Sequence, residues 1–319
     1  MIRRSQVSMH DFRTPPAEIE VDEPLVRRLL AAQAPAFAEA PIAPFASGWD
    51  NALFRVGPHH LARIPRRALA VPLIENEQLV LPAIARFLPR PVPAPVVMGR
   101  PLGDDYPWPW SLVPWIEGTP AADAPLNATG ALQLAEMLAS LHDLDPGLVP
   151  DGVTPNPVRG VPVARRQEAF DARRQQLATL AEPLSAELLA IWERALAAPP
   201  SLGRVILQGD PHARNVLTAG GELSAMIDWG DVTLGDPASD LACFWMLVDD
   251  ASARRRAIDR YVSLASHADM GRGFAALLAR SKGWALAYGA ILRVTGLADH
   301  PTHARMGLVT LRNLAEDAA

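Results

Sequence analysis

Short apolar runs separated by turn residues fill the chain up to about residue 115. Alternation of apolar and polar positions over a few residues is typical of a strand. We predict five strands of this kind, at residues 42–46, 52–56, 61–64, 96–98 and 110–115. A helix is predicted from Pro72, because proline is tolerated in a first helical turn, and Pro82 is expected to end or kink it. These elements make a small antiparallel five-stranded lobe with one helix.

Beyond Gly118 the apolar positions follow helical spacing. An apolar stripe at intervals of three, four and three joins Ala131, Leu134, Leu138 and Leu141. Further helices are predicted at residues 164–181, 184–198 and from 237 onward, interrupted by a strand at 204–207 and a hairpin with the turn Ala219-Gly220-Gly221. The fold class is therefore α+β, with a β-rich lobe at 1–112, a connector at 113–118 and a larger, mainly helical lobe at 119–319.

Composition narrows the class of protein. The chain of 319 residues is 49% hydrophobic and 20% charged, which is typical of a globular protein with a substantial core. Among its 30 basic residues only Lys282 is a lysine, and it lies in Ser281-Lys282-Gly283-Trp284. A phosphate-binding P-loop needs Gly-Lys followed by Ser or Thr, so that class of nucleotide-binding enzyme is excluded.

The net charge of −5 bears on partners and location. A basic face is usual in nucleic-acid-binding proteins, so we expect no nucleic-acid partner, and an acidic chain suits a cationic small-molecule ligand. We see no signal peptide in residues 1–23 and no membrane span, and we expect a cytoplasmic monomer or homodimer without a membrane partner. The single cysteine, Cys243, lies in an apolar run and is predicted to be a buried core residue.

Three polar side chains with the chemistry of phosphoryl transfer lie around the predicted hairpin. Asp210 and Asn215 lie in the loop before it, and Asp228 follows its second strand. Because a hairpin folds back on itself, we expect Asn215 and Asp228 to approach each other, where their oxygen atoms suit Mg²⁺. Asp210 is then placed to accept the proton of an attacking hydroxyl group. Each residue alone could be a turn former or cap, but the three together at these spacings favour the catalytic interpretation.

Three motifs follow one another within residues 209–241: Gly209-Asp210-Pro211-His212-Ala213-Arg214-Asn215, Ile227-Asp228-Trp229-Gly230-Asp231, and Gly235-Asp236-Pro237 with Asp240-Leu241. In these the chain resembles the aminoglycoside phosphotransferase family of small-molecule kinases, and weaker matches extend upstream to about residue 45. The resemblance implies a two-lobed protein-kinase-like fold, ATP or GTP as donor, Mg²⁺ as cofactor and a small-molecule hydroxyl group as acceptor. It also implies that Asp210 is the catalytic aspartate, with Asn215 and Asp228 as metal ligands.

The nucleotide-binding side departs from the family pattern. Such kinases place a lysine on the third strand, paired with a helix glutamate, whereas this chain has Arg63 there. Arginine can bind phosphate through two hydrogen bonds, but its planar shape differs from that of lysine. Glu77 shares a helix face with Ile74, Val80 and Leu81. A carboxylate in such an apolar stripe needs a cationic partner, so we expect Glu77 to pair with Arg63.

The rest of the nucleotide site is implied by the resemblance alone. Ser47 and Gly48 belong to the loop that would cover the phosphates, although a loop with one glycine is by itself an ordinary hairpin turn. The connector would contact adenine through its backbone. Since Pro114 has no N–H group, we expect Val113 or, preferably, Trp115 to donate.

Several neighbouring positions carry further expectations. Gln208 stands where the family commonly has histidine, and we expect it to orient the catalytic loop by hydrogen bonding. Asp236 and Asp240 are interpreted as structural residues at a helix start. Two positions stay open: Arg214 either stabilises phosphate charge or points to solvent, and Asp231 faces either the metal or the acceptor.

Functions of different classes follow from these motifs. The first is ATP/Mg²⁺-dependent phosphorylation of a hydroxyl group on an aminoglycoside-type antibiotic or a related amino alcohol or sugar, with macrolides and ordinary metabolites as other acceptors. The second is nucleotide binding without transfer, which Arg63 and the single-glycine loop suggest. A third is phosphate hydrolysis with the same carboxylates. The complete set of Asp210, Asn215 and Asp228 favours the first.

Overall fold

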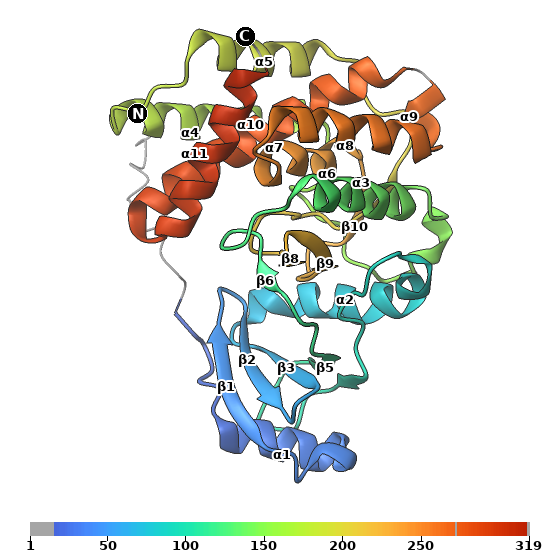
Figure 1. Cartoon of the computed structure of the whole chain (residues 1–319). Coiled ribbons are helices and arrows are strands. Elements are labelled where there is room, and N and C mark those ends of the chain that lie inside the picture. Colours follow the sequence, from blue (N-terminus) through green and yellow to red (C-terminus); the bar gives the residue numbers. More distant parts are fainter. Residues whose placement is uncertain (1–15, 272, 318–319) are drawn as a thin grey trace.

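The computed structural model describes residues 16–271 and 273–317, and it has the predicted α+β architecture in two lobes (Figure 1). The smaller lobe carries five antiparallel strands in the order β1-β2-β3-β5-β4. Their bounds are β1 Ile42–Ser47, β2 Asn51–Val56, β3 His60–Pro65, β4 Val97–Gly99 and β5 Trp110–Pro114. All five predicted strands are therefore confirmed. The expectation that no signal peptide is present falls largely on residues 1–15, which lie outside the described residues.

A helix that the sequence interpretation missed, α1 (Glu23–Gln33), covers the face of the sheet that points away from the helical lobe (Figure 1). Asp22 caps it by accepting a hydrogen bond from the Leu25 amide at 2.8 Å. Its apolar stripe, which includes Leu29, packs in one hydrophobic cluster with Phe54 of β2. This packing buries one face of the sheet and leaves the other to meet the catalytic residues of the larger lobe.

Helix α2 (Val71–Ile84) lies between the sheet and the helical lobe (Figure 1). Pro82 lies in its last turn, and the helix ends two residues later, at Ile84. By length and composition alone, the segment Ala68–Phe87 is apolar enough to span a membrane, a feature that the sequence interpretation overlooked. In this fold its apolar side chains Val80 and Ile84 belong to the main hydrophobic core, and a core helix meets the same two criteria.

The larger lobe is mainly helical and contains two short sheets. Its helices are α3 Ala128–His142, α4 Gln167–Thr179, α5 Ala186–Ala197, α6 Ala238–Leu241, α7 Cys243–Leu247, α8 Ala251–Leu264, α9 Ala268–Gly271, α10 Phe274–Asp299 and α11 Pro301–Glu316. Its strands are β6 Thr119–Pro120, β7 Val205–Leu207, β8 Val216–Ala219, β9 Glu222–Met226 and β10 Thr233–Gly235. Strands β8 and β9 form the predicted hairpin, whose turn residues Gly220 and Gly221 have φ values of 60° and 81°. Such left-handed values suit a two-residue hairpin turn.

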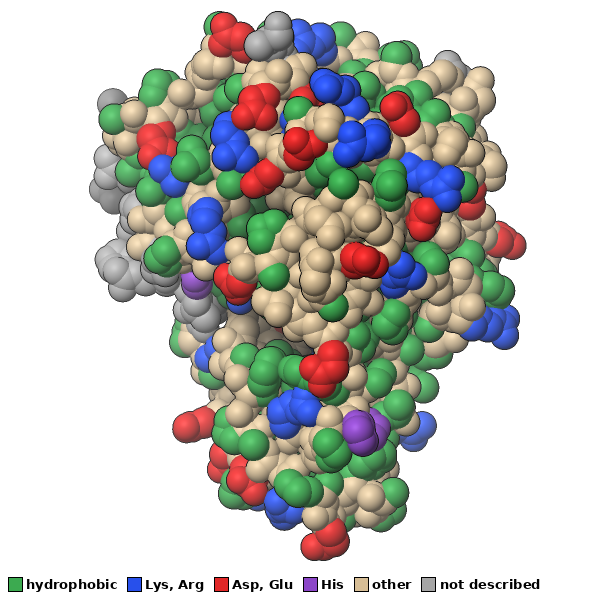
Figure 2. Space-filling model, viewed as in Figure 1, with side chains coloured by type: hydrophobic (Ala, Val, Ile, Leu, Met, Phe, Trp, Pro, Cys, Tyr) green, Lys and Arg blue, Asp and Glu red, His purple; other side chains and the backbone are tan. Residues whose placement is uncertain are grey.

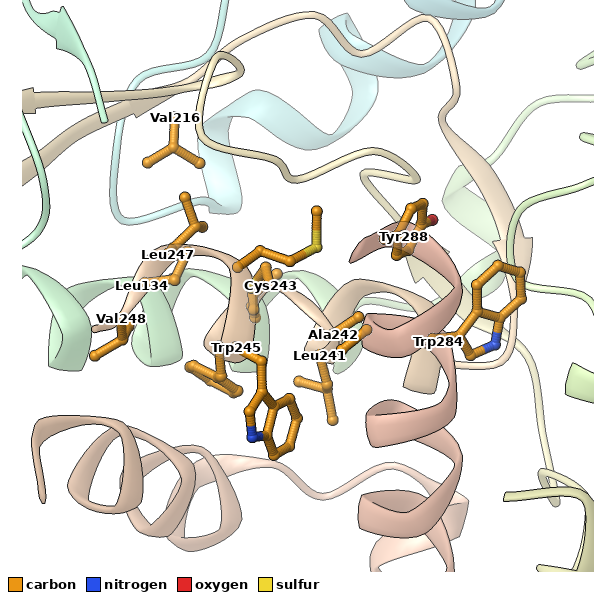
Figure 3. Packing of buried hydrophobic residues seen from close by; sticks show 14 of the residues in the cluster. Leu134, Val216, Leu241, Ala242, Cys243, Trp245, Leu247, Val248, Trp284 and Tyr288 are labelled. Atoms are coloured by element: carbon orange, nitrogen blue, oxygen red, sulfur yellow. The ribbon is translucent and has the colours of Figure 1, made fainter. Parts of the chain in front are cut away.

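The core of the larger lobe fixes the hairpin on the helices. Figure 3 shows Val216 of β8 near Leu134 of α3 and the apolar side chains of α7. Cys243 of α7 is completely buried, and burial raises the pKa of its thiol, so the predicted core residue is confirmed. A hairpin seated on this packed core gives the residues at its open end a rigid base.

Candidate active site

The catalytic loop, residues 208–215, joins β7 to the open end of the hairpin. The Ile227 amide donates to the Asn215 carbonyl oxygen at 2.8 Å, so Asp228 follows directly beside Asn215. The Asn215 side-chain nitrogen donates to the Asp210 carbonyl oxygen at 3.0 Å. The predicted approach of Asn215 and Asp228 is therefore confirmed, and the loop brings Asp210 to the same place.

Gln208 connects the catalytic loop to Ile227 and Asp228, which follow the second strand of the hairpin. Its Oε1 accepts a hydrogen bond from the Asp210 amide at 2.8 Å. Its Nε2 donates to the carbonyl oxygens of Ile227 at 3.2 Å and Asp228 at 2.7 Å. Asp228 has a φ of 56°, which residues other than glycine rarely adopt, and the bond from Gln208 helps to hold it there. The expected orienting contacts of Gln208 are thus present.

Arg63 of β3 lies at the centre of an ion-pair network that joins the two lobes. Its guanidinium donates to Glu77 Oε1 at 2.7 Å and to Asp228 Oδ1 at 3.2 Å. The same Glu77 oxygen accepts a hydrogen bond from the Trp229 amide at 2.8 Å. The predicted pairing of Arg63 with Glu77 is confirmed, and Arg63 also reaches a predicted metal ligand.

Both members of the Arg63–Glu77 pair are almost completely buried, with exposed fractions of 7% and 2%. Burial raises the pKa of Glu77 to about 7, against the lowering effect of the Arg63 charge. Burial by itself disfavours the charged form of Arg63, but the charges of Glu77 and Asp228 outweigh it and raise the pKa of Arg63. Removing Arg63 therefore leaves Glu77 buried without its cationic partner, whereas removing Glu77 leaves Arg63 with Asp228 as its remaining carboxylate.

The two predicted metal ligands offer oxygen atoms suited to Mg²⁺. Asn215 uses its amide nitrogen for the bond to Asp210, which leaves its amide oxygen as a ligand atom. Asp228 has a half-exposed side chain and engages one carboxylate oxygen with Arg63, which leaves the other. Among the described residues there is no group of three His, Cys, Asp or Glu that could hold a metal ion. These two residues fit Mg²⁺, which usually takes few protein ligands and completes its shell with water and phosphate oxygens.

The loop between β1 and β2, where Ser47 and Gly48 are predicted to cover the phosphates, is held by two arginines. Arg66 donates to the Ser47 hydroxyl oxygen at 3.0 Å and to the Gly48 carbonyl oxygen at 2.9 Å. Arg67 pairs with Asp50 at 2.6 Å. The Gly48 amide is bonded within the turn. The loop is thus a self-supporting hairpin turn, and its contact with phosphates stays a prediction.

The connector at 113–118 corrects one expectation about the nucleotide base. Val113 lies in the ladder with β3, and the Trp115 amide donates to the His59 carbonyl oxygen at 2.8 Å. The N–H group of Trp115 is therefore already bonded, so the preference for Trp115 as the adenine donor was wrong. The amides of Ile116, Glu117 and Gly118 donate no hydrogen bond within the described part of the chain, so these three are the donors that the connector leaves free.

Arg159, which the sequence interpretation missed, contacts the predicted catalytic aspartate. It lies between α3 and α4, with its guanidinium 2.9 Å from Asp210 Oδ1 and 3.6 Å from Asp231 Oδ2. Asp231 is thus placed beside Asp210. The guanidinium also lies over the Tyr288 ring, 5.1 Å from its centroid. The sequence signal for Arg159 is weak, since it is only that a glycine follows. In the structure Gly160 has a φ of 61° and passes so close to β7 that a Cβ there would lie 2.4 Å from a side chain of that strand.

Comparison with known proteins decides the family. The family model described as "phosphotransferase enzyme family" matches residues 41–274, most of the chain. This chain belongs to that family. The resemblance predicted from the motifs is therefore confirmed, and the protein is a phosphotransferase with an alcohol group as acceptor.

Individual relatives of the phosphotransferase are more distant. It is 29% identical over 225 residues to viomycin phosphotransferase from Streptomyces vinaceus, covering 68% of this chain and 75% of that protein. Its fold is similar to that of the GDP complex of aminoglycoside 2'-phosphotransferase-IIIa, with a TM-score of 0.64 and 15% identity over 93% of this chain and all of the other. Macrolide 2'-phosphotransferase type I is also similar, with a TM-score of 0.59 and 18% identity over 92% of this chain and 98% of the other. These structures confirm the two-lobed kinase-like fold.

Behind the catalytic loop of the phosphotransferase, the buried carboxylate of Asp240 holds the backbone. It accepts hydrogen bonds from the amides of Gln208 at 2.7 Å and Gly209 at 3.0 Å. Gly209 has a φ of 93°, and a Cβ there would lie 2.2 Å from the Asp231 carbonyl oxygen, so only glycine fits. These contacts agree with the structural interpretation of Asp240, although what its carboxylate supports is the catalytic loop and not the helix start.

A buried histidine–tyrosine relay extends this support to the surface. His142 Nε2 lies 3.4 Å from Asp240, and its Nδ1 lies 2.8 Å from the Tyr261 hydroxyl. The same hydroxyl lies 2.7 Å from His267 Nε2. Burial, and after it the neighbouring His142, lowers the pKa of His267 to about 4. The phosphotransferase therefore folds with His267 neutral at neutral pH.

We expect this histidine to make the phosphotransferase acid-sensitive. The unfolded chain binds a proton at His267 below its ordinary pKa of 6.5, whereas the folded chain does so only near pH 4. The free energy of unfolding therefore falls as the pH drops from about 6.5 towards 4, and His267→Gln should reduce that fall. Urea titrations of both proteins at pH 7 and pH 4.5 measure it. Equal losses in the two proteins would contradict the assignment, since every other titrating group is common to both.

We also expect Arg159 to position Asp210 for catalysis. Arg159→Gln removes the cation 2.9 Å from the carboxylate and should lower kcat by about 10- to 100-fold, because small misplacements of a reacting group are costly. Arg159→Lys should restore part of this loss. Steady-state kinetics should show an unchanged KM for the nucleotide, because the described contacts of Arg159 do not include Arg63, Asn215 or Asp228. A wild-type kcat in Arg159→Gln would show that the contact is incidental.

Proposed function

We propose that this phosphotransferase moves the terminal phosphoryl group of ATP or GTP to a hydroxyl group of a small molecule, with Mg²⁺ as cofactor. The observation that carries the proposal is one continuous series of contacts from Glu77 through Arg63, Asp228 and Gln208 to Asp210. It links the residue predicted to bind donor phosphates to the residue predicted to take the acceptor proton. The GDP complex of the similar aminoglycoside enzyme supports a nucleotide donor.

In this mechanism Asp210 accepts the proton of the acceptor hydroxyl group as its oxygen attacks the terminal phosphorus. The bond from that phosphorus to the bridging oxygen breaks, and the nucleoside diphosphate leaves. Arg63, fixed by Glu77, donates hydrogen bonds to the donor phosphates. Asn215 and Asp228 would hold Mg²⁺, which when bound neutralises charge on those phosphates.

For the acceptor we propose a hydroxyl-bearing antibiotic or a related amino alcohol or sugar. The relatives are named for viomycin, aminoglycosides and macrolides, which are chemically diverse. Such a range favours a shared transfer site with a variable acceptor surface. We place that surface on the helical lobe, which carries Asp210.

A diphosphate-release screen tests the function. Aminoglycosides, macrolides, viomycin and amino alcohols are offered with ATP or GTP, with and without Mg²⁺, to the wild type and Asp210→Ala. The proposal predicts acceptor-dependent release of ADP or GDP that requires Mg²⁺ and is lost in the variant. Thermal stabilisation by the nucleotide without transfer to any acceptor would favour a binding protein, and nucleotide-independent release of phosphate from a phosphorylated metabolite would favour a hydrolase.

A further inference from the structure

Three N–H groups along α10, one of them next to the catalytic loop, point to a ligand that accepts hydrogen bonds. They are Nε of Arg159, Nε of Arg166 and Nε1 of Trp284, which are buried atoms without an acceptor among the described residues. The Trp284 side chain is itself only 2% exposed. Buried donors in native proteins are nearly always paired, so three neighbouring unpaired donors call for a partner rich in acceptor atoms.

The aromatic side of α10 places these groups next to one another. Tyr288 and Trp284 project from successive turns of that helix, with ring centroids 5.6 Å apart (Figure 3). The Arg159 guanidinium lies over Tyr288 at 5.1 Å, and the Arg166 guanidinium lies over Trp284 at 5.9 Å. The two cations therefore follow the same aromatic surface, with Arg159 against Asp210 and Arg166 farther away.

The positive charges of Arg159 and Arg166 are balanced to different degrees. Arg159 faces the carboxylates of Asp210 and Asp231, whereas Arg166 has no ion-pair partner in the part of the chain that the structure describes. Burial, followed by the charge of Arg159, lowers the pKa of Arg166. Like charges in a half-buried row repel one another unless an anion joins them.

We propose that Arg166, with Arg159 and the Trp284 N–H group, forms a subsite for an anionic group on the acceptor, either a carboxylate or a phosphate. The inference rests on the proposed function, which places the acceptor hydroxyl group at Asp210. An anion held at Arg166 keeps the rest of the same molecule beside Arg159 and Asp210. The net charge of −5 favours a cationic acceptor, but basic and acidic side chains are interspersed on the face shown in Figure 2, so net charge does not describe one site.

Binding in the absence of nucleotide tests the subsite alone. The probes are four sugars with the same ring but different charge, namely glucose, glucosamine, glucuronate and glucose 6-phosphate. Inorganic phosphate is added as an anion without a sugar. Calorimetry compares the wild type with Arg166→Gln and with Arg174→Gln, a control at a more exposed arginine in α4, the helix that begins directly after Arg166, where it pairs with Asp171 at 3.1 Å. We expect the anionic probes to bind more tightly than glucose or glucosamine. Arg166→Gln should lose about tenfold or more of that affinity, and Arg174→Gln should lose none.

The terminal phosphate of the nucleotide is the other source of anionic oxygens. The affinity for Mg²⁺-ATP should be the same in Arg166→Gln and the wild type, and a loss there would assign the anion to the donor and overturn the proposal. Equal binding of charged and neutral probes, or anion binding that survives Arg166→Gln, would overturn it as well. Arg166-dependent binding of glucuronate or glucose 6-phosphate, without transfer to either of these sugars or to any acceptor in the screen, would leave the subsite standing and refute the proposed function instead.

Discussion

Asp210→Ala is expected to lower kcat by about 10²–10⁴-fold, the usual contribution of a positioned general base. The loss should be confined to chemistry, because the backbone of residue 210 carries the contacts that shape the site. Its amide donates to Gln208 and its carbonyl oxygen accepts from Asn215, and both bonds survive the substitution. The affinity for Mg²⁺-nucleotide, measured by calorimetry, should therefore stay at the wild-type value while turnover disappears.

A neighbouring carboxylate offers a matched control for this prediction. Asp231 lies near the same Arg159 guanidinium, at 3.6 Å against 2.9 Å for Asp210. Asp210→Asn keeps the size and the hydrogen-bond acceptor but cannot take a proton, so it should be as inactive as Asp210→Ala. Asp231→Asn should retain most of the activity. If Asp231→Asn is the inactive variant and Asp210→Asn still turns over, the base has been assigned to the wrong carboxylate.

The parts of the site that lie close together in sequence were predictable. The hairpin between Asn215 and Asp228 has a glycine turn, and its geometry brings its two ends together whatever surrounds it. Glu77 could be paired with Arg63 across 14 positions because a carboxylate on an apolar helix face has few ways to be stabilised. In both cases the local sequence is enough to determine which residues come into contact.

The parts that depend on register and on distant packing were not predictable. Whether the Trp115 amide is free depends on how β5 pairs with β3, which no local pattern states. Arg159 reaches Asp210 from a segment 51 positions earlier in the chain, where the packing of Gly160 against β7 and the hydrogen bond from the Arg159 amide to Asn156 hold it. An arginine in a proline-rich loop has no signal of its own, because such residues are usually solvated.

Arg63→Ala is expected to damage both stability and nucleotide binding. It leaves Glu77 buried and without its cationic partner, so the free energy of unfolding should fall by about 3–5 kcal/mol. The affinity for Mg²⁺-ATP should fall by about 10- to 100-fold, because charge-assisted hydrogen bonds to phosphate are lost. Arg63→Lys keeps the charge but not the planar fork that reaches Glu77 and Asp228 together, so it should lie between the alanine variant and the wild type.

The double variant Arg63→Ala/Glu77→Gln separates the two effects. Neutralising Glu77 removes the unpaired buried charge, and the Gln side chain keeps an oxygen that can accept from the Trp229 amide, so much of the stability should return in urea titrations. The nucleotide affinity should not return, because nothing replaces the cation beside Asp228. If the double variant binds Mg²⁺-ATP as the wild type does, Arg63 is a structural partner of Glu77 and the donor phosphates are held by another residue. If instead stability returns and affinity stays low, an arginine in this chain performs the phosphate binding that its family usually assigns to lysine.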